Sequence, residues 1–138
     1  MSKPVQIIDL FSGPGGLGEG FSSCKHNDGS RAYKIAVSIE KDRAAHKTLL
    51  LRAFLRQFDE YPSEYYSWIS GKRECPDWKA LYPRQWKSAE NEAICEELGK
   101  PSTAAILSER ISKTNRRAGD RTLLIGGPPC QAYSLAGR

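Results

Sequence analysis

Two short stretches carry residues whose types and spacing could do chemistry. Residues 9–18 hold glycines in the spacing G-x-G-x-x-G, directly after an apolar run. Such glycines let a strand turn sharply into a helix while backbone amides stay open to a ligand. Residues 126–134 read G-G-P-P-C-Q-A-Y-S, in which two prolines fix a turn immediately before Cys130. A cysteine presented in this way can act as a nucleophile through its thiolate.

The glycine stretch by itself predicts a cofactor with an adenosine part. Glu40 ends the second β-rich run, at a place where an acid can bind ribose hydroxyls. The same pattern fits a glycine-rich turn that binds nothing, and it also fits an NAD-dependent oxidoreductase with a catalytic cysteine. Cys130 has a plain alternative too, because free cysteines are often buried and inert.

Taken together, the two stretches resemble the C5-cytosine-specific DNA methyltransferase family. Residues 9–16 match its first motif, D-L-F-x-G-x-G-G, and residues 126–137 match its G-G-P-P-C-Q-x-x-S-x-A-G. Residues 40–48, E-x-D-x-x-A-x-x-T, are similar to its second motif. The resemblance covers residues 6–48 and 123–138. It implies an α/β, Rossmann-like fold that depends on S-adenosylmethionine, with a mostly parallel sheet, helices on both faces, and only part of the fold in this chain.

The resemblance also implies a set of cofactor-binding residues. Phe11 would pack against the adenine of S-adenosylmethionine, and Glu40 would hold the ribose. Family members often have an apolar or aromatic residue after this acid, whereas this chain has Lys41, whose aliphatic stem could cover the adenine. The third motif, which usually supplies an acid near the adenine amino group, falls on residues 98–100 without a carboxylate. The full set is Asp9, Phe11, Ser12, Gly13, Gly15, Gly16, Leu17, Glu40 and Lys41.

The implied reaction uses Cys130 as the catalytic nucleophile. Carbon C5 of cytosine is a poor nucleophile until a thiolate adds at C6, and the base must first be flipped out of double-stranded DNA. C5 then takes the methyl group, and loss of its proton expels the cysteine. The Pro128 carbonyl would approach the cytosine amino group, Gln131 would begin a loop that closes over the DNA, and Ser134 would reach a phosphate. A solvated loop serine is the alternative for Ser134.

Residues 1–138 lack the later motifs of this family: the E-N-V glutamate, an arginine-containing motif, a target-recognition domain and a final helix. The sequence is therefore interpreted as the amino-terminal portion of the catalytic domain, within a longer enzyme or as one half of a split enzyme with the remainder as partner. A different hypothesis makes it a DNA-binding or assembly module without catalysis.

Composition limits the class of protein only loosely. A formal net charge of +5 favours approach to a polyanion but does not establish nucleic-acid binding. The four cysteines form no C-x-x-C pair, and the first residues do not read as an export signal. This favours reduced thiols, in a protein that is located in a bacterial-type cytoplasm and associated with DNA. Apolar runs are too short to span a bilayer, so no membrane contact is expected. Cys24 and His26 lack a second ligand pair, and no metal is expected.

The elements that would position these residues alternate between strands and helices. Apolar runs predict strands at residues 5–11, 33–39 and 122–126, and helical spacing predicts helices through Phe21, over 41–58, and from a Ser102 cap to about Gly119. This order predicts a parallel sheet covered on both faces. Residues 59–100 break the order, and we interpret them as a family-atypical insertion of short helices. Their aromatics are predicted to form a small satellite core rather than a DNA-contacting surface.

Overall fold

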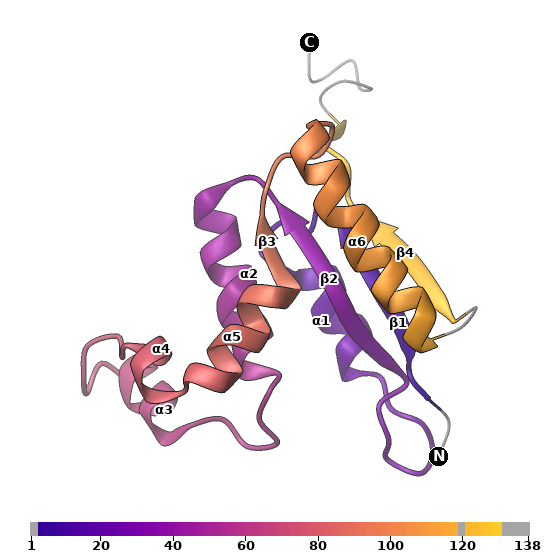
Figure 1. Ribbon diagram of the computed structural model, residues 1–138. Coiled ribbons are helices and arrows are strands. Elements are labelled where there is room, and N and C mark those ends of the chain that lie inside the picture. Colours follow the sequence, from indigo (N-terminus) through magenta and orange to yellow (C-terminus); the bar gives the residue numbers. More distant parts are fainter. Residues whose placement is uncertain (1–2, 119–120, 131–138) are drawn as a thin grey trace.

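The computed structural model describes residues 3–118 and 121–130. Four strands form one sheet in the order β3-β2-β1-β4, and every neighbouring pair is parallel (Figure 1). The strands are β1 Val5–Leu10, β2 Tyr33–Glu40, β3 Ala93–Cys95 and β4 Thr122–Gly126. The helices are α1 Gly16–Ser23, α2 Arg43–Leu55, α3 Ser63–Ile69, α4 Trp78–Leu81, α5 Pro83–Glu92 and α6 Pro101–Ala118.

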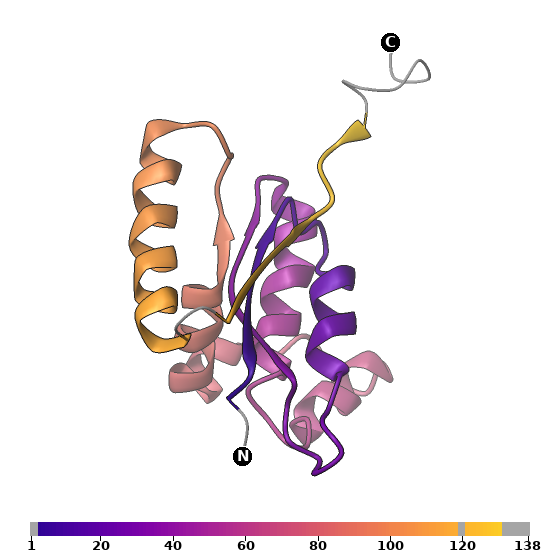
Figure 2. The same cartoon turned by 90° about the vertical axis from the view of Figure 1, so that its right-hand side faces the viewer.

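Helices cover both faces of the sheet, as the alternation of strands and helices predicted. In Figure 2 the orange helix α6 lies on one side of the strands, and α1 and α2 lie on the other. On the α6 face, Ile8, Val37 and Ile39 form a buried cluster, against which Leu107 and Ile111 of α6 pack. The α/β fold with a parallel sheet is therefore confirmed.

Helix α2 begins and ends for local reasons. The side chain of Asp42 accepts a hydrogen bond from the Ala45 backbone N–H at 2.8 Å and so caps the helix at Arg43. Leu49, Ala53 and Phe54 then face the core, as their spacing predicted. The helix ends at Leu55, three residues before the predicted end at Phe58.

The segment between α2 and α6 folds around Phe54. Its helices α3, α4 and α5 bring Trp78 and Trp86 to within 5.2 and 5.5 Å of the Phe54 ring, measured between ring centroids. Trp78 is buried, and Tyr65, Trp68 and Tyr82 pack against the same cluster. The aromatic satellite core is confirmed, although Tyr66 stays exposed. That residues 59–100 are an insertion relative to the family remains a prediction.

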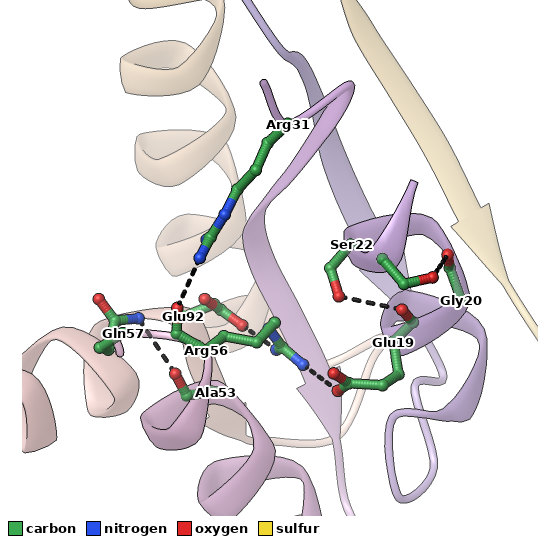
Figure 3. A network of polar contacts seen from close by, with 9 residues as sticks. Glu19, Gly20, Ser22, Arg31, Ala53, Arg56, Gln57 and Glu92 are labelled. Carbon is green, nitrogen blue, oxygen red and sulfur yellow. Dashed lines mark hydrogen bonds and ion pairs between the residues drawn. The ribbon is translucent and has the colours of Figure 1, made fainter. Parts of the chain in front are cut away.

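A buried ionic cluster joins three helices beside this core (Figure 3). Arg56, the residue that follows α2, forms ion pairs with Glu19 of α1 at 2.5 Å and with Glu92 of α5. Arg31 adds a hydrogen bond from its guanidinium to the Arg56 carbonyl at 3.2 Å. The cluster therefore connects α1, which follows the glycine loop, with α5 of the aromatic-rich segment 59–100.

Two details differ from the sequence-based expectations. Strand β3 lies within the segment that was assigned only short helices, and with three residues it is too short to give a periodic pattern. Helix α6 begins at Pro101, so Ser102 lies in its first turn instead of capping it. A proline suits the first helical position because its fixed φ matches the helix and its missing N–H needs no partner there. Within the described residues, no helix is long and apolar enough to cross a membrane.

Candidate functional site

The carboxyl ends of the parallel strands bring the predicted site segments together. Strands β1 and β4 end at Leu10 and Gly126, so the glycine loop and the proline-cysteine stretch begin at the same edge of the sheet. Glu40 is the last residue of β2 and lies at that edge too. Ligands of open α/β folds bind at such an edge. A pocket of about 300 Å³ opens there, lined by Phe11, Gly13, Ile39, Glu40, Lys41, Glu96, Glu97, Leu98, Gly127 and Pro129.

The glycine loop leaves β1 through left-handed backbone conformations. Phe11 has a φ of 57° and Gly13 a φ of 56°. A positive φ is unusual for a bulky side chain, and residues held in this way often occur at functional sites. The Phe11 side chain is 41% exposed and lines the pocket, so its ring offers an open aromatic face.

Hydrogen bonds hold the loop to the sheet. The backbone N–H of Ser12 donates to the Ile39 carbonyl at 2.9 Å, and its hydroxyl donates to the Asp9 carbonyl at 2.8 Å. Gly15, with a φ of 90°, precedes α1, and a Cβ there would lie 2.8 Å from Cδ1 of Leu49. Glycine is therefore required where the loop passes α2 and becomes a helix.

Glu40 ties the second strand to the glycine loop. Its carboxylate oxygens accept hydrogen bonds from the Gly13 N–H at 2.8 Å and from the Asp42 N–H at 2.7 Å. Each carboxylate oxygen has two lone pairs, so each can accept one further donor. A hydroxyl pair of a ligand in the pocket can therefore bind Glu40 without breaking the loop contact.

The third strand supplies two carboxylates that the sequence analysis missed. Glu96 and Glu97 directly follow β3 and line the pocket, together with Leu98. Residues 98–100, where the third motif is predicted to fall, come directly after them and carry no carboxylate. Glu96 and Glu97 could not be assigned to the site from the sequence, because the three-residue strand β3 gives no pattern that marks where it ends.

Asp9 lies beneath the loop instead of in the pocket. Its side chain is only 1% exposed, and neither carboxylate oxygen has a hydrogen-bond partner among the described residues. Burial raises the pKa of Asp9, and the positive charge of Arg56 only partly offsets this rise. A Cβ on Gly18 would lie 3.2 Å from its Oδ2, so this carboxylate packs under α1. Ser12, Gly15, Gly16 and Leu17 do not line the pocket either.

The proline-cysteine stretch also contributes residues to the pocket. Gly127 and Pro129 line it, and Cys130 follows as an exposed free thiol. A Cβ on Gly126 would lie 2.1 Å from the Leu10 carbonyl oxygen, so glycine is needed where β4 passes the end of β1. Pro128, which stands between Gly127 and Pro129 in the sequence, is exposed. Gln131 and Ser134 lie outside the described residues, and their predicted roles stay predictions.

Fold and site together define an α/β protein with a pocket of about 300 Å³ that is lined by a glycine loop and by the turn that leads to Cys130. Comparison with known proteins adds two relatives. Type II methyltransferase M.Bpa9945I of Bacillus paralicheniformis is 38% identical over 149 aligned positions, covering 96% of this chain and 32% of that protein. Type II methyltransferase M.SacI of Streptomyces achromogenes is 26% identical over 142 positions, covering 99% of this chain and 26% of that protein.

The chain is homologous to type II methyltransferases and spans about a third or less of the length of these relatives. Its sheet and helices are the corresponding part of a Rossmann-like methyltransferase fold. No family model matches the chain, and no solved structure matches it significantly.

Proposed function

We propose that this chain binds the cofactor and carries the nucleophile of a DNA (cytosine-5) methyltransferase of the restriction-modification type. The main support for this proposal is that the glycine loop, Glu40 and the cysteine turn line the same pocket. Phe11 and Gly13 of the glycine loop, Glu40 of β2, and Gly127 and Pro129 of the cysteine turn line one cavity. The chain's homology to type II methyltransferases agrees with this assignment.

The pocket fits the adenosine part of S-adenosylmethionine. Phe11 presents an aromatic face beside the apolar side chains of Ile39 and Leu98, which suits a flat base. Glu40 can accept from ribose hydroxyls, and Glu96 provides a carboxylate acceptor within reach of an exocyclic amine. A Cβ built on Gly13 would meet no atom within 4 Å, so the loop is open to a ligand there. When bound, the cofactor supplies an electrophilic methyl group on a sulfonium.

The chemistry of the chain's own residues centres on Cys130. Its thiolate would add to C6 of a flipped cytosine, which places electron density on C5 and makes that carbon nucleophilic. After methylation, removal of the C5 proton restores the ring and breaks the C6–S bond, so the thiolate is regenerated. The Pro128 carbonyl would accept from the cytosine amino group, Gln131 would begin the closing loop, and Ser134 would reach a phosphate of double-stranded DNA.

The chain's place in a whole enzyme is also a proposal. Because the relatives are about three to four times as long, we infer that residues 1–138 form the amino-terminal portion of a catalytic domain. Target recognition and the remaining catalytic groups would then come from further chain or from a partner polypeptide. Residues 59–100 would be an insertion that stabilises this portion through its aromatic core.

Residues 1–138 alone are expected to have no turnover, so the test uses the whole enzyme, in which they are joined by the further chain or partner polypeptide, with tritiated S-adenosylmethionine and mixed-sequence DNA. We expect the tritiated methyl group to appear on C5 of cytosine. DNA that contains 5-fluorocytosine should trap the enzyme covalently, because fluorine at C5 blocks the proton loss that releases the cysteine. Titration with NAD in place of S-adenosylmethionine distinguishes an oxidoreductase. Methylation of an exocyclic nitrogen, or NAD binding without S-adenosylmethionine binding, would refute the proposal.

A further inference from the structure

The outer rim of the pocket is closed by one carboxylate between two ammonium groups. Nζ of Lys41 lies 3.5 Å from Oε1 of Glu97, and Nζ of Lys100 lies 3.1 Å from Oε2 of the same residue. We call these three residues the rim clasp. Lys41 follows β2, whereas Glu97 and Lys100 belong to the connection between β3 and α6. The rim clasp therefore joins two loops that no described backbone hydrogen bond connects.

The rim clasp separates two cavities. Lys41 and Glu97 line the adenosine-sized pocket, and with Lys100 they also line a wider hollow of about 690 Å³ outside it. The hollow is strongly charged, and Arg43 and Lys47 also line it. Phe11, Ile39 and Leu98 give the pocket an apolar part of its lining. An adenine ring that packs on Phe11 would thus be separated from the hollow by the Lys41–Glu97 ion pair.

The carboxyl group of Glu97 is held in its ionised form. The nearby Lys100 and Lys41 lower the pKa of the Glu97 carboxyl, because both ammonium groups favour its ionised state. The methylene stem of Lys41 can cover an apolar ring while its ammonium group stays at the surface. The stem can do this only while the ammonium group is held near Glu97.

We propose that the rim clasp forms the outer wall of the adenosine pocket and makes cofactor affinity depend on ionic strength. This inference rests on the proposed function, since it assumes that the pocket binds adenosine. The physical reason is screening, because exposed ion pairs weaken as salt shortens the Debye length. A weaker pair lets Lys41 swing away, and the ring then loses its outer cover.

The expected effect is modest, because both side chains are substantially exposed. Exposed ion pairs change equilibria by about 1.5- to 5-fold. We expect a decrease of this size in affinity for S-adenosylhomocysteine between about 0.02 M and about 1 M salt. S-adenosylhomocysteine is the suitable probe because it lacks the sulfonium charge, which would add its own salt dependence.

The experiment is a double-mutant cycle on the intact protein, measured by calorimetric titration with S-adenosylhomocysteine at low and high salt. The variants are Lys41→Gln, Glu97→Gln and the two combined. Each single variant should bind about 1.5- to 5-fold more weakly at low salt, and the double variant should bind no more weakly than either. At high salt this non-additivity should vanish.

A matched control is Lys79→Gln, which breaks an ion pair of the same 3.5 Å length with Glu90, away from the pocket. It should leave affinity and its salt dependence unchanged. Additive effects of the two single variants, or a salt dependence that persists in the double variant, would overturn the rim clasp as a pocket wall. If the wild type binds no S-adenosylhomocysteine at all, the proposed function fails and not the rim clasp alone.

Discussion

Gly126 and Leu10 approach so closely that no side chain fits between them. A Cβ on residue 126 would lie 2.1 Å from the Leu10 carbonyl oxygen, which is a backbone atom in the neighbouring strand. The contact lies where β4 and β1 end, directly before the cysteine turn and the glycine loop. It therefore sets how near these two segments come to each other.

Gly126→Ala should consequently destabilise the protein. The added methyl group must push β4 away from β1, and overpacking of this kind costs about 1–3 kcal/mol. Gly127→Ala is the matched control, since the nearest atom to its Cβ, apart from its chain neighbours, would be the Phe11 carbonyl oxygen at 4.0 Å. Urea unfolding of the two variants measures the difference. Equal midpoints for both would contradict the close approach of the strands.

Arg56→Met tests the buried ionic cluster. The substitution leaves Glu92 buried without its cation, and breaking one partner of a buried pair costs about 3–5 kcal/mol. Burial already raises the pKa of Glu92, so the loss should be smaller at acidic pH, where this carboxyl can take up a proton. Lys113→Met breaks an exposed pair with Glu109 and should have a much smaller effect, because solvent screens exposed charges. A loss for Arg56→Met as small as that of the control would refute a structural role for the cluster.

Asp9 gives the protein a stability that depends on pH. Its pKa is raised by burial, so the folded protein holds the proton more tightly than the unfolded one. The resulting stabilisation is present below the unfolded pKa of about 3.9 and is lost as pH rises through the folded pKa. Asp9→Asn, which cannot ionise, should therefore gain stability relative to wild type as pH rises through this window.

Unfolding of wild type and of Asp9→Asn by denaturant, between about pH 4 and pH 8, measures the difference between their free energies of unfolding. Asp28→Asn is a suitable control, because hydrogen bonds from Ser30 lower the pKa of Asp28, so its contribution to stability changes only below the unfolded pKa and should stay constant across this range. Curves for Asp9→Asn and wild type that stay parallel over the whole range would show that Asp9 does not titrate differently in the folded protein.

The parts of this fold that sequence alone could predict are those with strong local patterns. The strand before Phe11 is a largely apolar run stopped by glycines, and the strand before Gly127 has the same form. Strand β3 has no such pattern, because it has only three residues, and its place beside β2 follows directly after α5, which packs against Phe54. Glu96 and Glu97 could not be placed for that reason, since their position depends on where β3 ends.

The ionic cluster and the rim clasp were also beyond sequence reasoning. Arg56 and Glu19 are 37 positions apart, and Lys41 and Glu97 are 56 apart. Charged residues at such separations carry no periodic signal, and only the packing of helices and loops brings them together. The glycine loop and the cysteine turn could be recognised because each is contiguous in sequence.

Phe11→Ala should weaken binding of S-adenosylhomocysteine. The substitution removes the aromatic face from the pocket, and an aromatic contact is worth on the order of 1 kcal/mol beyond its buried area, so a loss of about fivefold is expected. Tyr66→Ala removes another exposed aromatic ring, on α3 and away from the pocket, and should leave affinity unchanged. Titration calorimetry on the intact protein provides both values. Unchanged affinity in Phe11→Ala would exclude this pocket as the adenine site.

Cys130→Ser should abolish methyl transfer by the intact enzyme while leaving S-adenosylhomocysteine and DNA binding largely intact. A serine hydroxyl is nearly isosteric with the thiol, but it is far less acidic and less polarisable, so it cannot add to C6 at neutral pH without a strong base beside it. Cys130 is exposed at the end of the turn, so the exchange should not disturb the core.

The other three cysteines provide the controls, because Cys24, Cys75 and Cys95 are also exposed free thiols. Changing each of them to serine should leave both turnover and trapping by 5-fluorocytosine DNA intact. Cys95 is the most demanding control, since it borders the hollow outside the rim clasp and its thiol lies 4.0 Å from the Lys41 carbonyl oxygen. A peptide map of the trapped complex should place the DNA on Cys130. Attachment to any other cysteine, or an adduct that survives in Cys130→Ser, would show that the nucleophile assigned here is the wrong one.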